Sequence, residues 1–139
     1  MPDKTFEHTI GFELTRRLPL IEVNLLRPDG SRVGLSLLFD TGASVTTLRS
    51  DLYHLLDVPS WDSGVPQQVA TAGGAASVQA YRYQVNLELL GKTVQCPVHL
   101  QELPQNPLYS GLLGRDTIFQ HFGFGFWESS SELYATLNP

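Results

Sequence analysis

The sequence predicts an all-β protein, a small and partly closed β-barrel with one short C-terminal helix. Short stretches in which apolar and polar residues alternate, or in which Val, Ile, Leu and Thr gather, recur along the chain and are typical of strands. Clusters of Gly, Pro, Asp and Ser separate these stretches at short intervals, as turns between strands require. Helical patterns are few and short. Many strands joined by frequent turns favour a barrel.

The composition is that of one globular domain. A chain of 139 residues is long enough to bury a core, and its content of 42% apolar and 17% charged residues suits a folded β-rich protein. The net charge of -5, without any basic run, argues against nucleic-acid binding. We expect one domain over residues 1–139, with its core at about 18–137 and a strand extension at 5–15.

The first half of the chain contains four strand patterns and one helical turn. The strand patterns occupy residues 6–14, 19–26, 33–39 and 45–48. Pro28 and Gly30 mark a hairpin turn between the second and the third of these strands. Ser50 is a predicted N-cap for a helical turn at residues 51–56.

The second half continues with a hairpin, further strands and one helix. The strand patterns occupy residues 68–71, 77–81, 83–89, 93–100, 124–126 and 132–137. The first two are the arms of a hairpin, and a Gly-Gly pair favours such a turn. The predicted tip of this hairpin consists of Ala72, Gly73, Gly74 and Ala75. A helical pattern spans residues 115–122.

The sequence predicts no metal, no cofactor and no membrane segment. The four histidines, at positions 8, 54, 99 and 121, are scattered rather than spaced as metal ligands. No phosphate-binding glycine loop occurs, and no apolar run approaches the roughly 18 residues of a membrane-spanning helix. The N-terminal residues lack a secretory signal pattern, so a cytoplasmic location is expected. Cys96 is the single cysteine and is expected to be a buried, inert thiol.

One stretch carries a chemical signature, because residues 37–44 read Leu-Leu-Phe-Asp-Thr-Gly-Ala-Ser. The apolar run predicts a buried strand that ends in a turn, and Gly42 allows the backbone to turn tightly. Asp40 then lies at the tip of a rigid strand with backbone N–H groups nearby, which suits an acid–base catalyst. Asp and Gly are also ordinary turn residues, so the tripeptide alone leaves a plain turn open.

A second stretch near the C-terminus reads Gly-Leu-Leu-Gly-Arg-Asp and precedes the helical pattern. Alone, it predicts a strand end with a turn. Together and in this order, the two stretches resemble the retropepsin group of aspartic proteases, and the resemblance covers roughly residues 18–137. It implies that the apolar pair and the glycine close a strand behind the catalytic loop and that Arg-Asp opens the helix. The residues concerned are Leu112, Leu113, Gly114, Arg115 and Asp116.

The single Asp-Thr-Gly implies a homodimer. Aspartic-protease chemistry needs two carboxylates that share one proton, because two like charges a few ångströms apart cannot both ionise easily. One carboxylate is the base toward water, and the other hydrogen-bonds to the scissile carbonyl. This chain is too short for a second lobe, so the resemblance implies that Asp40 meets Asp40 of a second copy across a two-fold axis. The implied substrate is a peptide or protein.

The resemblance also implies roles for the residues that follow Asp40. Thr41 bonds across the dimer and locks the two loops together. Gly42 brings its backbone close to the substrate and the carboxylates. Ala43 matches the small residue of retroviral enzymes, and its lack of a hydroxyl group implies a less acidic pH optimum.

Ser44 departs from the retroviral pattern, which usually has Asp at this place and pairs it with the helix arginine. Arg115 is therefore expected to pair with another acid, or to hold the loop through backbone carbonyls. Asp116 is expected to support the first helical turn rather than to take part in catalysis.

In retropepsin-like enzymes, a glycine-bearing hairpin that follows the Asp-Thr-Gly loop in the chain is the flap, which closes over the substrate. The resemblance implies this role for residues 72–75, and a plain exposed turn is the alternative. Possible liners of the cleft, each as easily part of the core, are Leu38, Val69, Ala70 and Leu112.

The leading hypothesis is a homodimeric aspartic endopeptidase that hydrolyses peptide bonds through a water molecule activated by the Asp40 pair under a flap. The first alternative is a retropepsin-fold dimerisation or peptide-binding module with little or no turnover, which Ser44 and the unusual flap tip keep open. An unrelated β-barrel binding protein that carries Asp-Thr-Gly by chance is a third hypothesis, against which the second motif argues.

Overall fold

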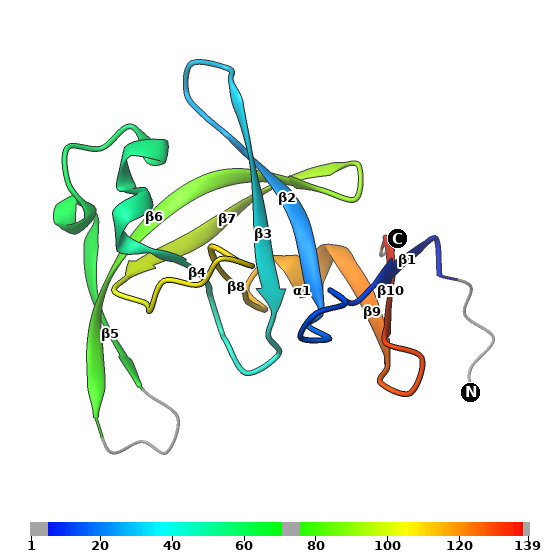
Figure 1. Cartoon of the computed structure of the whole chain (residues 1–139). Helices are drawn as coiled ribbons and strands as arrows, with labels where there is room; N and C mark the ends of the chain where they lie inside the picture. The colour runs from blue at the N-terminus through cyan, green and yellow to red at the C-terminus, as the bar shows by residue number, and fades with distance from the viewer. Residues whose placement is uncertain (1–5, 71–75, 138–139) are drawn as a thin grey trace.

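The computed structural model describes residues 6–70 and 76–137. Within them strands predominate and the helices are short, as predicted (Figure 1). The strands are β1 (His8–Gly11), β2 (Leu20–Leu26), β3 (Arg32–Phe39), β4 (Thr46–Arg49), β5 (Val65–Ala70), β6 (Ser77–Leu89), β7 (Lys92–Gln101), β8 (Gly111–Leu113), β9 (Phe122–Trp127) and β10 (Glu132–Leu137). The helical elements are η1 (Ser50–Leu56), η2 (Trp61–Ser63) and α1 (Ile118–His121).

Six strands form a closed barrel. The larger sheet has the order β2-β3-β8-β4-β7-β6-β5, and β2 also pairs with β6. The ring therefore closes through β2, β3, β8, β4, β7 and β6, while β5 continues from β6 beyond the ring. The closing ladder is short, with Asn24 opposite Glu88 and Leu26 opposite Asn86. The barrel is thus more complete than the partly closed one that the sequence predicted.

The core lies inside this ring. Alternate residues of β2 point inward, and Ile21, Val23 and Leu25 are each at most 3% exposed. Leu87 of β6 and Leu100 of β7 face them within the same apolar cluster. Each such buried side chain contributes about 1.5–3 kcal/mol relative to an exposed one. The period of two that predicted these strands therefore arises from their inward faces.

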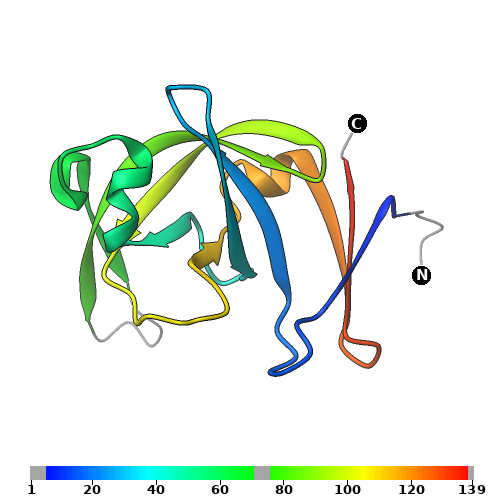
Figure 2. The same ribbon diagram turned by 45° about the horizontal axis from the view of Figure 1, so that its top comes forward.

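The ends of the chain form a second, three-stranded sheet of order β1-β10-β9. Figures 1 and 2 show the N-terminal and C-terminal strands side by side at one end of the molecule. This sheet is tied to the barrel because Phe12, Phe122 and Leu133 are buried in the common core. The sheet packs as part of the same body as the barrel.

Two helix predictions were wrong in detail. Ser50 lies inside the 3-10 helix η1, and Arg49 takes the N-cap position without a side-chain capping bond. The helix predicted at 115–122 is only the four residues of α1. Thr117, just before it, has φ of +69° in the left-handed region, which breaks the helix on its N-terminal side. The N–H groups of Arg115 and Asp116 bond to the carbonyls of Ala43 and Ser44 in the β3–β4 loop.

In the described part of the chain, no helix is long and apolar enough to span a membrane.

Cys96 is fully buried in β7, and burial raises the pKa of its thiol to about 12. The thiol is therefore protonated at neutral pH and is inert, as the sequence predicted.

Candidate active site

Asp40 lies directly after β3, at the start of a tight loop. Its backbone N–H donates to the carbonyl of Leu113 at 3.2 Å, and its carbonyl accepts from the N–H of Ala43 at 3.2 Å. The N–H of Gly42 donates to Asp40 Oδ1 at 2.9 Å. A Cβ on Gly42 would lie only 3.1 Å from that oxygen, so the missing side chain lets the loop close on the carboxylate. The carboxylate is held by backbone and remains partly exposed.

The residue before Asp40 is anchored in an aromatic cluster. The N–H of Phe39 donates to the carbonyl of Pro19 at 2.9 Å. The ring centroid of Phe39 lies 4.9 Å from that of Phe124 and 5.7 Å from that of Phe119. Aromatic pairs of this kind contribute about 0.5–1.5 kcal/mol beyond the area that they bury. The end of β3 is therefore a rigid support for the carboxylate.

Strand β8 runs between β3 and β4 behind the loop. It pairs in parallel with β3 and antiparallel with β4, so Leu112 lies opposite both Leu38 and Thr47. The approach is close enough to require glycine at both ends, because a Cβ on Gly111 would lie 2.0 Å from the carbonyl oxygen of Thr47. A Cβ on Gly114 would lie 2.4 Å from the carbonyl carbon of Val45.

Backbone hydrogen bonds tie the segment after β8 to the β3–β4 loop. The N–H of Arg115 donates to the carbonyl of Ala43 at 3.0 Å, and that of Asp116 donates to the carbonyl of Ser44 at 2.8 Å. The buried N–H of Gly114 donates to Thr46 Oγ1 at 3.0 Å. Sequence reasoning missed Thr46, whose role needs the register of β4 against β8.

The arginine and the aspartate after Gly114 contact different parts of the chain. Arg115 is exposed, and its backbone N–H holds the β3–β4 loop through the carbonyl of Ala43. Asp116 instead faces Arg82 of β6, with 3.9 Å between the Asp116 carboxylate and the Arg82 guanidinium. The Oδ1 atom of Asp116 also accepts a hydrogen bond from the Thr117 hydroxyl at 3.1 Å. The pairing acid at this site is thus Asp116, and its partner comes from β6.

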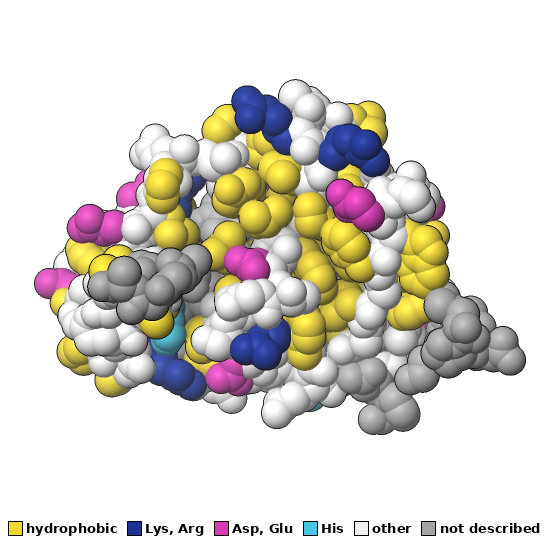
Figure 3. All heavy atoms as spheres, turned by 90° about the horizontal axis from the view of Figure 1, so that it is seen from below, with side chains coloured by type: hydrophobic (Ala, Val, Ile, Leu, Met, Phe, Trp, Pro, Cys, Tyr) yellow, Lys and Arg dark blue, Asp and Glu magenta, His cyan; other side chains and the backbone are white. Residues whose placement is uncertain are grey.

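An open cleft of about 850 Å³ adjoins Asp40. The cleft is lined by Asp40, Gly42, Ala43, Ser44, Val45, Thr47, Gln67, Gln68, Val69, Ala70, Arg82, His99, Gln101 and Leu112. Three of the four liners named from the sequence are among them, and Leu38 is not. Figure 1 places the β3–β4 loop on the same side of the molecule as the end of β5 and the start of β6, and Figure 3 views the molecule from that side.

The arms of the predicted flap are a regular hairpin. Strands β5 and β6 pair antiparallel from Val65 opposite Arg82 to Ala70 opposite Ser77. The last four residues of β5, 67–70, line the cleft. The predicted tip of Ala72, Gly73, Gly74 and Ala75 lies outside the described residues. The described arms nevertheless lead directly to it.

The cleft also contains two basic side chains that sequence reasoning did not assign to it, Arg82 and His99. His99 is 7% exposed, and its Nε2 atom is buried without a hydrogen-bond partner among the described residues. Burial, reinforced by the neighbouring charge of Arg82, lowers the pKa of His99, and Asp116 opposes this effect. The signal in the sequence was a histidine between Val98 and Leu100, in a strand otherwise apolar at these positions.

His99 should make folding stability depend on pH. The unfolded chain binds this proton near the ordinary pKa of 6.5, whereas the folded protein binds it only at lower pH. The free energy of unfolding should therefore fall as the pH drops below about 6.5, until the folded pKa is reached. In the His99→Leu variant this fall should be absent when the free energy of unfolding is measured by urea titration at a series of pH values. Superimposable pH profiles of the two proteins would contradict the assignment.

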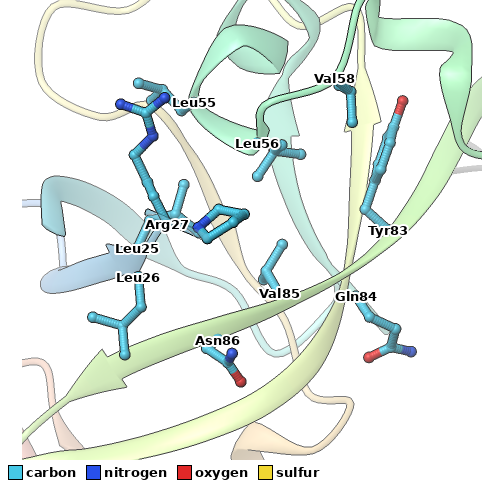
Figure 4. A pocket seen from close by; sticks show the side chains of 11 residues that line it. Leu25, Leu26, Arg27, Leu55, Leu56, Val58, Tyr83, Gln84, Val85 and Asn86 are labelled. Carbon is cyan, nitrogen blue, oxygen red and sulfur yellow. The ribbon is translucent and has the colours of Figure 1, made fainter. Parts of the chain in front are cut away.

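Two other hollows lie outside the cleft. One, of about 370 Å³, is lined by Pro19, Phe39, Asp40, Thr41 and Phe126 on the other side of the catalytic loop. The second, of about 430 Å³, lies between η1, β6 and the end of β2, and Figure 4 shows its mainly apolar lining. It contains Leu25, Leu56 and Val85 but no residue of the two motifs. In the described part of the chain, no group of three His, Cys, Asp or Glu side chains could hold a metal ion.

Comparison with known proteins assigns the chain to a family. Residues 25–117, which run from the end of β2 to the start of α1 and include both motifs, match the family model described as Aspartyl protease. The solved structure of EIAV protease complexed with the inhibitor HBY-793 is similar in fold, with a TM-score of 0.51 and 20% sequence identity over 76% of this chain and 88% of that chain. A comparison with curated proteins finds no match. The chain therefore belongs to the aspartyl protease family and is an aspartic endopeptidase with a retropepsin-like fold.

Proposed function

We propose that this endopeptidase is a homodimer in which Asp40 of each chain supplies one carboxylate of a catalytic pair. The observation that carries the proposal is that Asp40 is the only carboxylate among the described residues that line the cleft. Aspartic-protease hydrolysis needs two carboxylates that share a proton. A two-fold axis beside the β3–β4 loop supplies the second one from an identical loop.

In the proposed dimer, the ionised carboxylate takes a proton from a water molecule, whose oxygen attacks the carbonyl carbon of the scissile peptide bond. The protonated carboxyl group of the other chain donates a hydrogen bond to the carbonyl oxygen, where negative charge develops. The Gly42 N–H on Asp40 Oδ1 supports this geometry because it leaves Oδ2 for the water molecule. Exposed Thr41 is proposed to bond across the dimer.

We also propose that the β5–β6 hairpin is a flap that closes over the bound peptide. The arms of the hairpin border the cleft, and residues 67–70 contribute directly to its lining. Gly73 and Gly74 at the tip suit a segment that must bend and let its backbone approach the substrate. Closure excludes water from the reacting groups and so strengthens their electrostatic interactions.

The far side of the catalytic loop supports a dimer interface. Phe126 and Trp127 of β9 are 48% and 36% exposed, which is unusual for such large apolar side chains. Phe126 shares a hollow with Asp40 and Thr41. β9 is also an edge strand of its sheet, with backbone groups open to further pairing. We propose that a second copy covers this surface and that the terminal strands β1 and β10 contribute to the interface.

Phe126→Glu should convert the dimer to a monomer, because it places a charge in an apolar contact. Light scattering should give the mass of one chain, and peptide cleavage should be lost with the second carboxylate. Val65→Glu is the matched control for oligomeric state, since Val65 is also a large apolar residue and is 60% exposed on β5. A wild-type preparation that cleaves peptides while entirely monomeric would contradict the shared site.

A peptide-binding module with little turnover is the second candidate. It is favoured by Ser44, which stands where the retroviral pattern has an acid. The described hydrogen bond of Ser44 is made by its backbone carbonyl, which accepts from the N–H of Asp116. Cleavage of a mixed peptide library across a range of pH separates the two functions. An endopeptidase yields defined internal cuts, whereas a module binds peptides and leaves them intact.

A further inference from the structure

Four side chains form a row across the floor of the cleft, one from each of four neighbouring strands. Leu112 of β8 lies opposite Thr47 of β4, Thr47 lies opposite His99 of β7, and His99 lies opposite Arg82 of β6. Directly paired residues project on the same face of a sheet, and all four line the cleft. Three strand spacings of about 4.8 Å put Arg82 roughly 14 Å from Leu112. The row therefore leads away from the catalytic loop.

The row changes from apolar to basic along its length. Leu112 is apolar, and the hydroxyl of Thr47 is already used, because it donates to the carbonyl of Val45 at 3.1 Å. The buried Nε2 of His99 has no partner among residues 6–70 and 76–137, and the side chain of Arg82 is 36% exposed. Among the described residues that line the cleft, Arg82 is the only one with a full positive charge. The end of the row far from β8 thus carries positive charge and unused donors.

The described residues do not satisfy the hydrogen-bonding capacity of this basic end. A buried polar atom without a partner costs about 1–3 kcal/mol, and folded proteins rarely keep one. Arg82 has five N–H donors, and its one ion pair with a described residue, Asp116, is long at 3.9 Å. An apolar ligand lying here would cover both groups and leave them unpaired, whereas a carboxylate can accept hydrogen bonds from both.

We propose that Arg82 and His99 bind an acidic side chain of the substrate, so that the endopeptidase selects Asp or Glu at the peptide position that lies over this end of the cleft. The proposal rests on the proposed peptidase function and adds a substrate class to it. Arg82 supplies the charge, and His99 supplies a short-range hydrogen bond that fixes the position of the carboxylate. Gln68 and Gln101 nearby add polar lining without charge.

The test compares matched peptides that differ only by Glu, Gln, Leu or Lys at each position around a cleaved bond. At one position, the wild type should cleave the Glu peptide about tenfold faster than the Gln or Leu peptide, as a charged hydrogen bond of this kind implies. Arg82→Glu should reverse the preference, so that Lys is cleaved best at the same position. His99→Leu should reduce the preference for Glu without loss of folding stability. Arg32→Gln is the matched control, because Arg32 is an exposed strand arginine that pairs with Glu88 outside the cleft.

Equal cleavage of all four peptides by the wild type, or an unchanged preference in Arg82→Glu, would overturn the proposal while leaving the peptidase function intact. Absence of any cleavage would instead count against the proposed function. In that case, binding of the same labelled peptides to the Asp40→Asn variant, measured by fluorescence anisotropy, tests the preference for an acidic side chain without relying on cleavage. Tighter binding of the Glu peptide supports it, and equal binding of the four overturns it.

Discussion

Replacing Asp40 by Asn is expected to abolish peptide cleavage and to leave the fold and the proposed dimer intact. The amide has nearly the size of the carboxylate, and its oxygen can still accept the hydrogen bond from the Gly42 N–H. It cannot take a proton from water, so the base of the reaction is lost. General-base catalysis contributes about 10²–10⁴-fold, and we expect a loss at the upper end of that range. Cleavage of a library-selected peptide, circular dichroism and light scattering together measure the three properties.

The matched control for this variant is Asp116→Asn. Asp116 belongs to the second motif and faces Arg82, but it does not line the cleft. Its neutralisation should leave most of the cleavage rate. Equal loss of activity in both variants would show that cleavage depends on negative charge in the region rather than on a proton-accepting Asp40. Full activity of Asp40→Asn would disprove the catalytic pair.

Gly114→Ala is expected to destabilise the fold strongly and to disturb the loop that carries Asp40. The added Cβ would lie 2.4 Å from the carbonyl carbon of Val45 and 2.6 Å from the nitrogen of Thr46, and both are backbone atoms. Backbone in a packed barrel cannot move away cheaply, and overpacking of this kind costs about 3 kcal/mol. The shift would also break the bond from the Gly114 N–H to Thr46 Oγ1 and displace the catalytic loop. Urea unfolding and peptide cleavage should both report a large loss.

Gly11→Ala is the control for Gly114→Ala. Gly11 is also a glycine in β structure, but nothing lies within 4 Å of a Cβ built on it. Its replacement should change the free energy of unfolding by less than about 0.5 kcal/mol. If Gly114→Ala unfolds at the same urea concentration as wild type and keeps full activity, then β8 does not pack against the loop as the structure describes.

Much of the site could be predicted because its signals are local. The apolar run before Asp40 and the Asp-Thr-Gly turn specify a strand and its end within a few residues, and the structure places Asp40 directly after β3. The hairpin at Pro28 and Gly30 follows from turn chemistry in the same way, since Gly30 has φ of +88°. Two short motifs in the right order then sufficed to identify the aspartyl protease family.

The helix after β8 was predicted too long on its N-terminal side. Residues 115–122 have a helical pattern, and the N–H of Phe119 does donate to the carbonyl of Arg115 at 3.0 Å, but Thr117 has φ of +69° and interrupts the helical backbone. Propensity is a weak local preference, and the tertiary structure overrides it at Thr117. The free N–H groups of Arg115 and Asp116 bond instead to the carbonyls of Ala43 and Ser44, which holds the second motif against the first.

The sequence by itself determined the all-β class, the strand and turn that carry Asp40, and the family, because strand periodicity and turn residues act over a few positions. Only the tertiary structure decided that β2 meets β6 to close the barrel, that Thr46 receives the N–H of Gly114, and that Arg82 rather than Arg115 faces Asp116. It also set the register that brings Arg82 and His99 together on the floor of the cleft. Register between strands far apart in the chain depends on the packing of the whole barrel, since a shift of one residue would turn every side chain to the other face.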